Sequence, residues 1–253
     1  MNITTRLAAA IAALALFAGA AMAQTCEVFG EAPMLAERVA AGDLPPAAER
    51  IPSNPMVLAV AEEIGTYGGE MLDLYDGSRL AEFRQFGYES LVRWSTDGSE
   101  VIPNIAAGWE VSPDGSSYTF TLREGLRWSD GHPFTTADIQ FYFDEVAFEP
   151  YNCCNDYMLV DGQQPVVEII DDLTFSMSWD APNSTLLQNL ATSYGVQVTQ
   201  FAAHYLEQFS MKKNPEAVEA LMAEDGYDDY NEWWAANVGR YGQNSEYNNP
   251  DRP

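Results

Sequence analysis

The stretch that decides the fold is residues 102–146, IPNIAAGWEVSPDGSSYTFTLREGLRWSDGHPFTTADIQFYFDEV. Its segment YTFTLR alternates apolar and polar side chains, which predicts a half-buried strand with Tyr118, Phe120 and Leu122 on one face. The preceding residues 112–115, Ser-Pro-Asp-Gly, are typical of a tight turn, because proline presets φ and glycine tolerates positive φ. Apolar residues also alternate before this turn, so the sequence predicts a hairpin.

A capped helix is predicted to follow the hairpin. Thr135 and Asp138 have the spacing of a capping box, in which a hydroxyl and a carboxylate accept hydrogen bonds from free backbone N–H groups. The apolar residues after this cap repeat at the spacing of one buried helix face, and they are Ile139, Tyr142, Phe143 and Val146. Between hairpin and helix, Glu124-Gly125 and Ser129-Asp130-Gly131 indicate turns, and Trp128 and Phe134 are interpreted as core aromatics.

The rest of the chain predicts a second hairpin and several helices. The second hairpin is expected from residues 166–170 and 173–179. A strand at residues 70–75 and a helix at residues 79–92 are expected before the central stretch. Further helices are expected at residues 33–41, 182–190, 201–209 and 214–224. Asn214 is expected to be the N-cap of the helix at 214–224 and Gly226 to stop it, and Asp228 is expected to cap one last helix. This order predicts an α+β or mixed α/β fold of antiparallel hairpins with packed helices.

The first residues are typical of a secretory signal peptide. An apolar run from Leu7 to Ala21 follows the single early charge, Arg6, and Ala21-Met22-Ala23 is a small-x-small cleavage site. We therefore assign residues 1–23 to a cleaved signal and expect mature protein from Gln24 in the periplasm. A transmembrane anchor is disfavoured, because the run is shorter than the roughly 20 residues needed to span a bilayer.

The chain is strongly acidic. It carries 12 basic and 38 acidic residues, a formal net charge of −26, and loss of Arg6 with the signal makes the mature chain still more negative. Such a surface repels phosphate backbones, so a nucleic-acid partner is excluded, and anionic membranes are disfavoured. Solubility or a salty habitat accounts for this charge, although a cationic ligand would also gain from it.

Cysteine and histidine are scarce. Cys26 can form one disulfide, with Cys153 or with Cys154, whereas the two adjacent cysteines are poorly placed to pair with each other. His132 and His204 are interpreted as surface or packing residues. No phosphate-binding loop, nucleophile elbow or metalloprotease helix is present, so the sequence predicts no enzyme, no cofactor and no metal site.

Several blocks of the chain resemble one protein family. In the central stretch they are Ile102-Pro103, Gly108-Trp109, Ser112-Pro113-Asp114-Gly115, the strand from Tyr118 to Arg123, Trp128-Ser129-Asp130-Gly131 and Thr136-Ala137-x-Asp138. Downstream, VVEIIDDLTFSMSWDAPNSTLLQNLA resembles the second hairpin and helix of that family. AAHYLEQF resembles its Pro-x-His-Tyr-Leu segment, with Ala202 where proline is usual. The blocks together resemble the signature of extracellular solute-binding proteins of family 5, the periplasmic peptide, oligopeptide and nickel receptors of ABC importers.

The resemblance implies a periplasmic binding protein of type II, a two-lobed clamshell that closes on its ligand. It assigns residues 24–66 to an N-terminal arm and residues 67–253 to an incomplete lobe one, with the second lobe missing. The implied partners are a small solute, expected to be a peptide, and an inner-membrane ABC permease. We expect a monomer without direct membrane insertion after signal cleavage. We also expect weak or no binding by the chain alone, because one lobe leaves a ligand exposed to solvent.

By the same resemblance, two loops of lobe one face the ligand. Their residues are Tyr75, Asp76, Gly77 and Ser78 in the first loop, and Tyr151, Asp156 and Tyr157 in the second. Tyrosine can stack on a ligand and aspartate can receive its amino terminus, while plain loop residues are the alternative interpretation. Two other functions stay open. One is a secreted interaction or structural module that pairs with a separately encoded second lobe, and the other is a secreted hydrolase, which the lack of a nucleophile or metal cluster disfavours.

Overall fold

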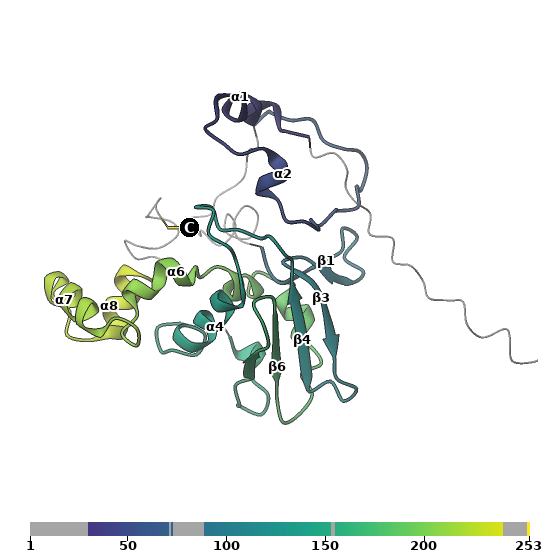
Figure 1. The fold of residues 1–253 in the computed structure, drawn as a ribbon. Helices are drawn as coiled ribbons and strands as arrows, with labels where there is room; N and C mark the ends of the chain where they lie inside the picture. Colours follow the sequence, from purple (N-terminus) through teal and green to yellow (C-terminus); the bar gives the residue numbers. More distant parts are fainter. Residues whose placement is uncertain (1–29, 71, 73–88, 153–154, 240–251) are drawn as a thin grey trace, which may run out of the picture. The chain divides into compact units, whose positions relative to one another are not determined.

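The structure of the chain, a computed structural model, describes residues 30–70, 72, 89–152, 155–239 and 252–253 (Figure 1). The predicted signal peptide, the predicted site residues from Tyr75 to Ser78 and the three cysteines lie outside these ranges. Almost everything described belongs to one unit, residues 31–253. In this described part of the chain, no helix is both long enough and apolar enough to span a membrane.

Four antiparallel strands form the main sheet, in the order β3-β4-β6-β5 (Figure 1). They are β3 (Ala106–Val111), β4 (Ser117–Leu122), β5 (Val166–Ile169) and β6 (Thr174–Ser178). Both predicted hairpins are confirmed, because β3 pairs with β4 and β5 pairs with β6. Pairing of β4 with β6 then joins the two hairpins into one sheet.

One face of this sheet is buried, as the alternation in β4 predicts. Tyr118, Phe120 and Leu122 are almost fully buried, and Phe120 lies directly opposite Phe175 of β6. The rings of Phe120 and Phe175 stack with their centroids 5.4 Å apart. Such an aromatic pair stabilises a sheet by about 0.5–1.5 kcal/mol beyond the area that it buries. Periodicity in the sequence therefore locates the centre of the core correctly.

Helix α4 (Thr136–Glu145) begins at the predicted capping box. The Thr135 hydroxyl accepts a hydrogen bond from the N–H of Ala137 at 3.2 Å, and one Asp138 oxygen accepts one from the N–H of Thr135 at 2.9 Å. The other Asp138 oxygen accepts a hydrogen bond from the N–H of Ala203 at 2.9 Å. Burial raises the pKa of Asp138 although these hydrogen bonds oppose the shift. One carboxylate thus caps the helix and ties a distant segment to it.

The predicted buried face of α4 is confirmed for three of its four residues. Ile139, Tyr142 and Val146 are buried, whereas Phe143 is only partly buried. The Tyr142 hydroxyl, buried in the core, donates a hydrogen bond to the side-chain oxygen of Asn155 at 3.0 Å. The helix therefore packs with its apolar stripe inward and satisfies the one polar atom of that stripe from a loop.

Shorter helices complete the described fold. Helix α1 (Pro33–Ala41) ends at Gly42, whose φ of 81° lies in the left-handed region that glycine adopts readily, so this predicted helix is confirmed. The other helices are α2 (Ala47–Arg50), η1 (Asp156–Met158), α5 (Leu186–Leu190), η2 (Gly195–Thr199), α6 (Ala203–Leu206), η3 (Glu207–Phe209), α7 (Pro215–Asp225) and α8 (Tyr230–Asn237).

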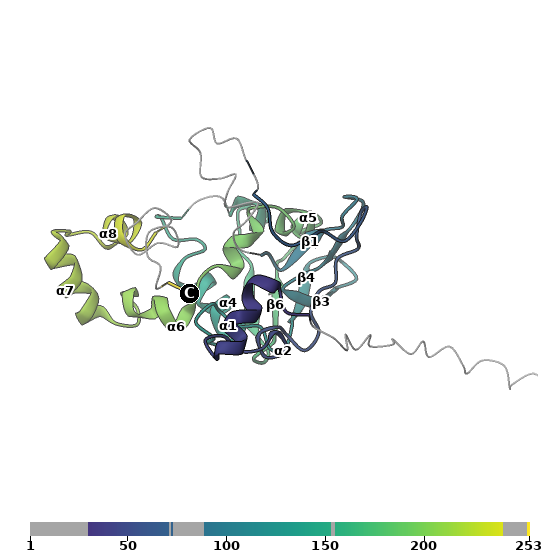
Figure 2. The ribbon, with the colours of Figure 1, turned by 90° about the horizontal axis from the view of Figure 1, so that it is seen from above.

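The helix predicted at residues 79–92 is wrong at its described end. There β1 (Val92–Trp94) pairs with β2 (Val101–Pro103) in a separate two-stranded sheet, and α5 packs against β1 (Figure 2). Leu91 and Val92 are both fully buried although they are adjacent in sequence. Tertiary burial on both sides of the chain has overridden the helical spacing of the apolar residues here.

The predicted start of α7 is confirmed, with Asn214 at the N-cap position and Pro215 first in the helix, although the Asn214 side chain donates a hydrogen bond to the Glu207 carbonyl at 2.7 Å and does not cap the helix. Two other predicted helix starts need correction. Helix α8 is capped by Asp229 in place of Asp228, because the Asp229 carboxylate is the one that accepts the N–H of Glu232, at 2.9 Å. Helix α5 begins only at Leu186. Sequence places helices better than it places their first residues.

Candidate functional site

Tyr151, the first described residue of the predicted ligand loops, packs into the protein. Its hydroxyl donates a hydrogen bond to the Glu145 carbonyl at the end of α4. Its ring stacks on Trp234 with centroids 5.2 Å apart and meets Tyr230 edge-on at 6.3 Å. Burial raises the pKa of the Tyr151 hydroxyl well above its ordinary value, so this group is a neutral donor. In this structure Tyr151 joins α4 to α8.

Asp156 and Tyr157 lie in the short helix η1. Asp156 is exposed, whereas the Tyr157 hydroxyl is buried and has no hydrogen-bond partner among the described residues. Burial raises the pKa of Tyr157, and its ring lies 6.4 Å from that of Tyr194. The ring contacts of Tyr151 and Tyr157 share no residue, so the structure does not join these two tyrosines into one site. Their role toward a ligand stays a prediction.

A pocket of about 430 Å³ lies elsewhere in the described part of the chain. It brings together residues that are far apart in sequence: Glu89, Ile105, Leu126, Arg127, Trp128, Ser129, Phe134, Thr199, Arg252 and Pro253. This volume is in the range of pockets that hold small molecules. Trp128 and Phe134 form its aromatic wall, with ring centroids 5.3 Å apart and planes inclined by 56°. The pocket is therefore our candidate binding site.

The aromatic wall is built by a tight loop between the hairpin and α4. The N–H of Trp128 donates to the His132 carbonyl at 2.8 Å, and the N–H of Phe134 donates to the Leu126 carbonyl at 2.9 Å. Gly131, with a φ of 90°, allows the chain to reverse between them. Trp128 and Phe134 are only 8% and 7% exposed, so the sequence-based interpretation as core aromatics is correct, yet both also line the pocket.

The polar side of the pocket comes from two other segments. The Thr199 hydroxyl donates to the Glu89 carbonyl at 2.6 Å and so joins the end of η2 to the residues before β1. The Glu89 carboxylate accepts a hydrogen bond from Asn104 at 2.8 Å and lies 3.8 Å from the Arg93 guanidinium. Sequence analysis missed Glu89 and Thr199, because no local motif marks either residue.

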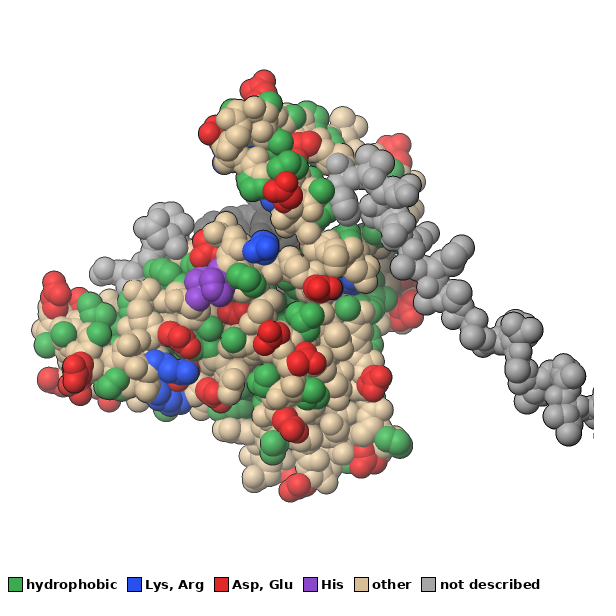
Figure 3. All heavy atoms as spheres, viewed as in Figure 1, with side chains coloured by type: hydrophobic (Ala, Val, Ile, Leu, Met, Phe, Trp, Pro, Cys, Tyr) green, Lys and Arg blue, Asp and Glu red, His purple; other side chains and the backbone are tan. Residues whose placement is uncertain are grey.

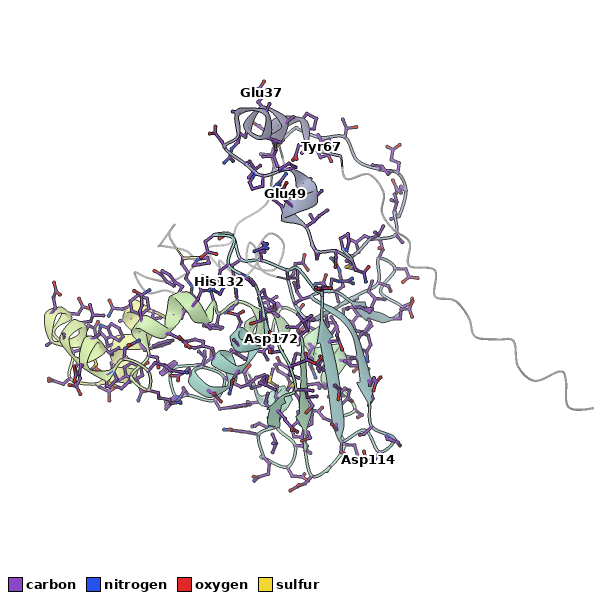
Figure 4. All side chains as sticks on the ribbon, in the orientation of Figure 1. Glu37, Glu49, Tyr67, Asp114, His132 and Asp172 are labelled. Atoms are coloured by element: carbon purple, nitrogen blue, oxygen red, sulfur yellow. The ribbon has the colours of Figure 1, made fainter. Side chains whose placement is uncertain are left out.

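The two histidines of the chain meet beside this pocket. The rings of His132, labelled in Figure 4, and His204 stack with centroids 3.9 Å apart and planes inclined by only 10°. A His204 ring nitrogen lies 2.7 Å from the Asp130 carboxylate, and the His204 ring is 6.5 Å from Trp128. Although desolvation acts in the opposite direction, hydrogen bonds from His132 and His204 lower the pKa of Asp130. His204 thus packs beside Trp128, and the exposed His132 stacks on His204.

This geometry supports the binding of a small molecule. Among the described residues, no cluster of three or more His, Cys, Asp or Glu side chains is arranged to hold a metal ion. The pocket combines an aromatic wall, aliphatic side chains and a few polar groups, which is the usual make-up of small-molecule sites.

Comparison with known proteins shows a similarity to one family. Residues 100–202 match the family model described as bacterial extracellular solute-binding proteins, family 5 Middle. Over these residues the chain is similar to solute-binding family 5. The match begins just before β2 and ends at the start of α6, so it includes the main sheet, α4 and the aromatic wall of the pocket. The resemblance that the sequence blocks indicated is therefore confirmed over these residues.

Two curated proteins illustrate this similarity. The periplasmic alpha-galactoside-binding protein of Rhizobium meliloti (strain 1021) is 34% identical over 128 residues, which are 42% of this chain and 18% of that protein. The dipeptide-binding protein of Escherichia coli (strain K12) is 33% identical over 122 residues, which are 42% of this chain and 23% of that protein. The matched parts therefore span less than a quarter of either relative.

Solved structures confirm the predicted fold of the chain. An oligopeptide-binding protein OppA matches 82% of this chain with a TM-score of 0.66 and 29% identity, over 32% of its own length. The periplasmic binding protein MelB from Agrobacterium fabrum C58, solved with stachyose, matches 83% of this chain with a TM-score of 0.55 and 22% identity, over 33% of its own length. The mixed α/β architecture is thus that of part of a periplasmic binding protein.

Proposed function

We propose that this chain is part of the periplasmic solute-binding component of an ABC importer, that its solute is a peptide, and that it delivers this solute to a membrane permease. The observation that carries the proposal is the structural match to an oligopeptide-binding protein over 82% of the chain. A dipeptide-binding protein among the curated relatives supports the same solute class. The predicted signal at residues 1–23 supports export to the periplasm.

An oligosaccharide is the second candidate solute. One curated relative is named as an alpha-galactoside-binding protein, and MelB was solved with stachyose. The pocket is compatible with a sugar, because Trp128 offers an indole beside the hydroxyl groups of Ser129 and Thr199. Sugar rings and peptide side chains both gain from an aromatic wall, so the wall alone does not separate these two classes.

The proposed organisation keeps residues 24–66 as an arm and residues 67–253 as lobe one. A lobe that binds a ligand alone gives it only part of the contacts that a closed clamshell provides. Small-molecule sites usually bury 70–90% or more of a ligand's surface, and a single lobe does not reach that fraction. We therefore expect the chain by itself to bind its solute weakly, with a dissociation constant of about 1 mM or weaker.

Isothermal titration of the purified chain tests the proposal. One series uses pools of di-, tri- and tetrapeptides, and a matched series uses raffinose and stachyose at equal concentrations. We expect weak, saturable binding of peptides and none of the sugars. Saturable binding of the sugars alone would replace the peptide with an oligosaccharide. Absence of saturable binding in both series would contradict a solute-binding role for this chain and favour an interaction module.

A further inference from the structure

The charge of the pocket differs from the charge of the chain. Acidic residues outnumber basic ones by 38 to 12 in the sequence, and acidic side chains are spread over the face seen in Figure 3. The charged side chains that line the pocket are instead two arginines, Arg127 and Arg252, and one glutamate, Glu89, and Pro253 lies there too. An exposed guanidinium in an acidic protein gives an anion a local point of attraction.

Arg127 is the cation that this pocket holds in an accessible position. Its side chain is exposed, and its guanidinium donates a hydrogen bond to the Gly131 carbonyl at 2.9 Å, which orients the group on the tight loop. No carboxylate among the described residues lies within ion-pair distance of Arg127. Other basic side chains do pair with carboxylates, namely Arg50, Arg93, Lys212 and Lys213.

The acidic side chain of the pocket, Glu89, is already engaged. Glu89 accepts the Asn104 amide at 2.8 Å and faces Arg93 at 3.8 Å. These contacts compensate part of its charge, so Glu89 does little to cancel the field of Arg127. A guanidinium that keeps free N–H groups is the side chain best suited to a carboxylate, because the two groups can form parallel hydrogen bonds.

The aromatic wall of the pocket indicates the chemistry of the rest of the ligand. Trp128 and Phe134 present aromatic rings, and Ile105 and Leu126 add aliphatic surface. Arg127 and the aromatic residues Trp128 and Phe134 all line the same pocket. The volume of about 430 Å³ is enough for a group the size of one amino-acid residue.

We propose that this pocket binds an apolar carboxylate, with the carboxylate on Arg127 and the apolar body against Trp128 and Phe134. Where the solute is a peptide, this group is its C-terminal residue, and in that respect the inference rests on the proposed function. A free aryl or alkyl carboxylate has the same chemistry and is distinguished below.

The test compares two probes that differ only in charge, N-acetylphenylalanine and N-acetylphenylalanine amide. Binding to the purified chain is followed by saturation-transfer NMR and isothermal titration. We expect the acid to bind about tenfold more tightly than the amide, because a charge-assisted hydrogen bond replaces a neutral one. Arg127→Gln should make the two probes equal, while Arg127→Lys should keep part of the preference. Lys212→Gln removes another exposed cation, which pairs with Glu149 outside the pocket, and should leave the preference unchanged.

Three outcomes would overturn the inference: equal binding of acid and amide, an acid preference that survives in Arg127→Gln, or no binding of either probe. Because Arg127 is exposed, its replacement should not unfold the chain, and circular dichroism of each variant checks this. Alanyl-phenylalanine and 3-phenylpropionate identify the source of the carboxylate. Tighter binding of the dipeptide assigns the site to a peptide C-terminus, and tighter binding of 3-phenylpropionate assigns it to a free carboxylate.

Failure of the proposed function gives a different pattern. If the peptide pools and sugars all fail to bind while N-acetylphenylalanine binds through Arg127, the carboxylate site is supported and the proposed solute-binding function is contradicted. If the peptide pools bind but show no dependence on a carboxylate or on Arg127, the receptor role stands and the inference falls.

Discussion

Two turns of this molecule have nearly the same sequence and the same hydrogen bonds. Residues 95–99 read Ser-Thr-Asp-Gly-Ser, and residues 112–116 read Ser-Pro-Asp-Gly-Ser. In each turn one aspartate oxygen accepts from the hydroxyls of the two flanking serines and from the backbone N–H of the second serine. The glycines have φ values of 71° and 72°. Local sequence has therefore produced one structure twice.

The strands beside these turns are very different. The first turn joins β1 and β2, which have three residues each and form a sheet by themselves. The second joins β3 and β4, which have six residues each and belong to the four-stranded sheet with a buried aromatic face. A two-stranded sheet is at best marginally stable alone in water, whereas three or more strands with a buried face are stable. Turn chemistry sets where a strand reverses, and burial sets how far the sheet extends.

The largest expected loss of stability that distinguishes the two sheets is in the strand after the second turn. Phe120→Ala should lower the free energy of unfolding by about 3–5 kcal/mol, because it removes a fully buried ring and leaves a cavity against Phe175. Ile102→Ala, on β2 after the first turn, is the matched control and should cost much less, because Ile102 is only partly buried. Chemical denaturation followed by circular dichroism measures both. Equal losses in the two variants would contradict the difference between the sheets.

A smaller effect is expected at the one position where the turns differ. Pro113→Thr should lower the free energy of unfolding by about 0.4–1 kcal/mol, because proline restricts the unfolded chain at a place where the folded turn accepts it. In the first turn, Thr96→Pro should gain less than that amount, because it removes the Thr96 hydroxyl that donates to the Ala59 carbonyl at 3.1 Å. Thermal unfolding of the two exchanged variants tests this. A clear gain in stability for Pro113→Thr would show that the turns are not equivalent.

The smallest effect is a dependence on pH that both turns should share. Hydrogen bonds, first of all from the Ser112 hydroxyl, lower the pKa of Asp114 from 3.8 to about 2. Hydrogen bonds led by the Ser95 hydroxyl likewise lower the pKa of Asp97 to about 2. Because each folded-state pKa is below the ordinary value, each carboxylate stabilises the fold above about pH 4, and this contribution is lost as the pH falls toward 2.

Asp114→Asn and Asp97→Asn should therefore be slightly less stable than the unchanged chain at pH 7 and equal to it near pH 2. Denaturant titrations at several pH values measure this difference. A loss for Asp97→Asn as large as that for Asp114→Asn would mean that both sheets unfold together. A loss for Asp114→Asn alone would mean that the two-stranded sheet opens separately. A difference from the unchanged chain that grows toward pH 2 would contradict the assigned hydrogen bonds.

Much of the fold follows from short-range patterns. The alternation around Phe120 identified the buried face of β4, and the spacing of Thr135 and Asp138 identified the cap of α4. Gly42 and Gly226 marked the ends of α1 and α7. These features could be predicted because each depends on interactions between residues only a few positions apart. The start of α5 could not, because propensity is a weak guide where tertiary contacts dominate.

The candidate site was much less predictable. Its aromatic wall lies on the central stretch, so Trp128 and Phe134 were noticed, but only as core residues. Glu89 and Thr199 both line the pocket and are joined by a hydrogen bond, although they are 110 positions apart in the sequence. The binding role of Arg127 could not be predicted, because it depends on which carboxylates lie near Arg127 in space. A binding site of this kind is a property of distant segments, and no local signal marks it.

The sequence by itself determined the turns, the two hairpins and the capped helix, because a turn, an alternating strand and a cap are each decided within a few residues. Only the tertiary structure decided that β4 and β6 join the hairpins, that residues 92–94 form a strand, and that Asp138 binds Ala203. It also decided that an arginine in a strongly acidic chain lies at an aromatic pocket without a carboxylate partner in the described part of the chain. Burial and charge act on neighbours in space, and folding alone sets which residues those are.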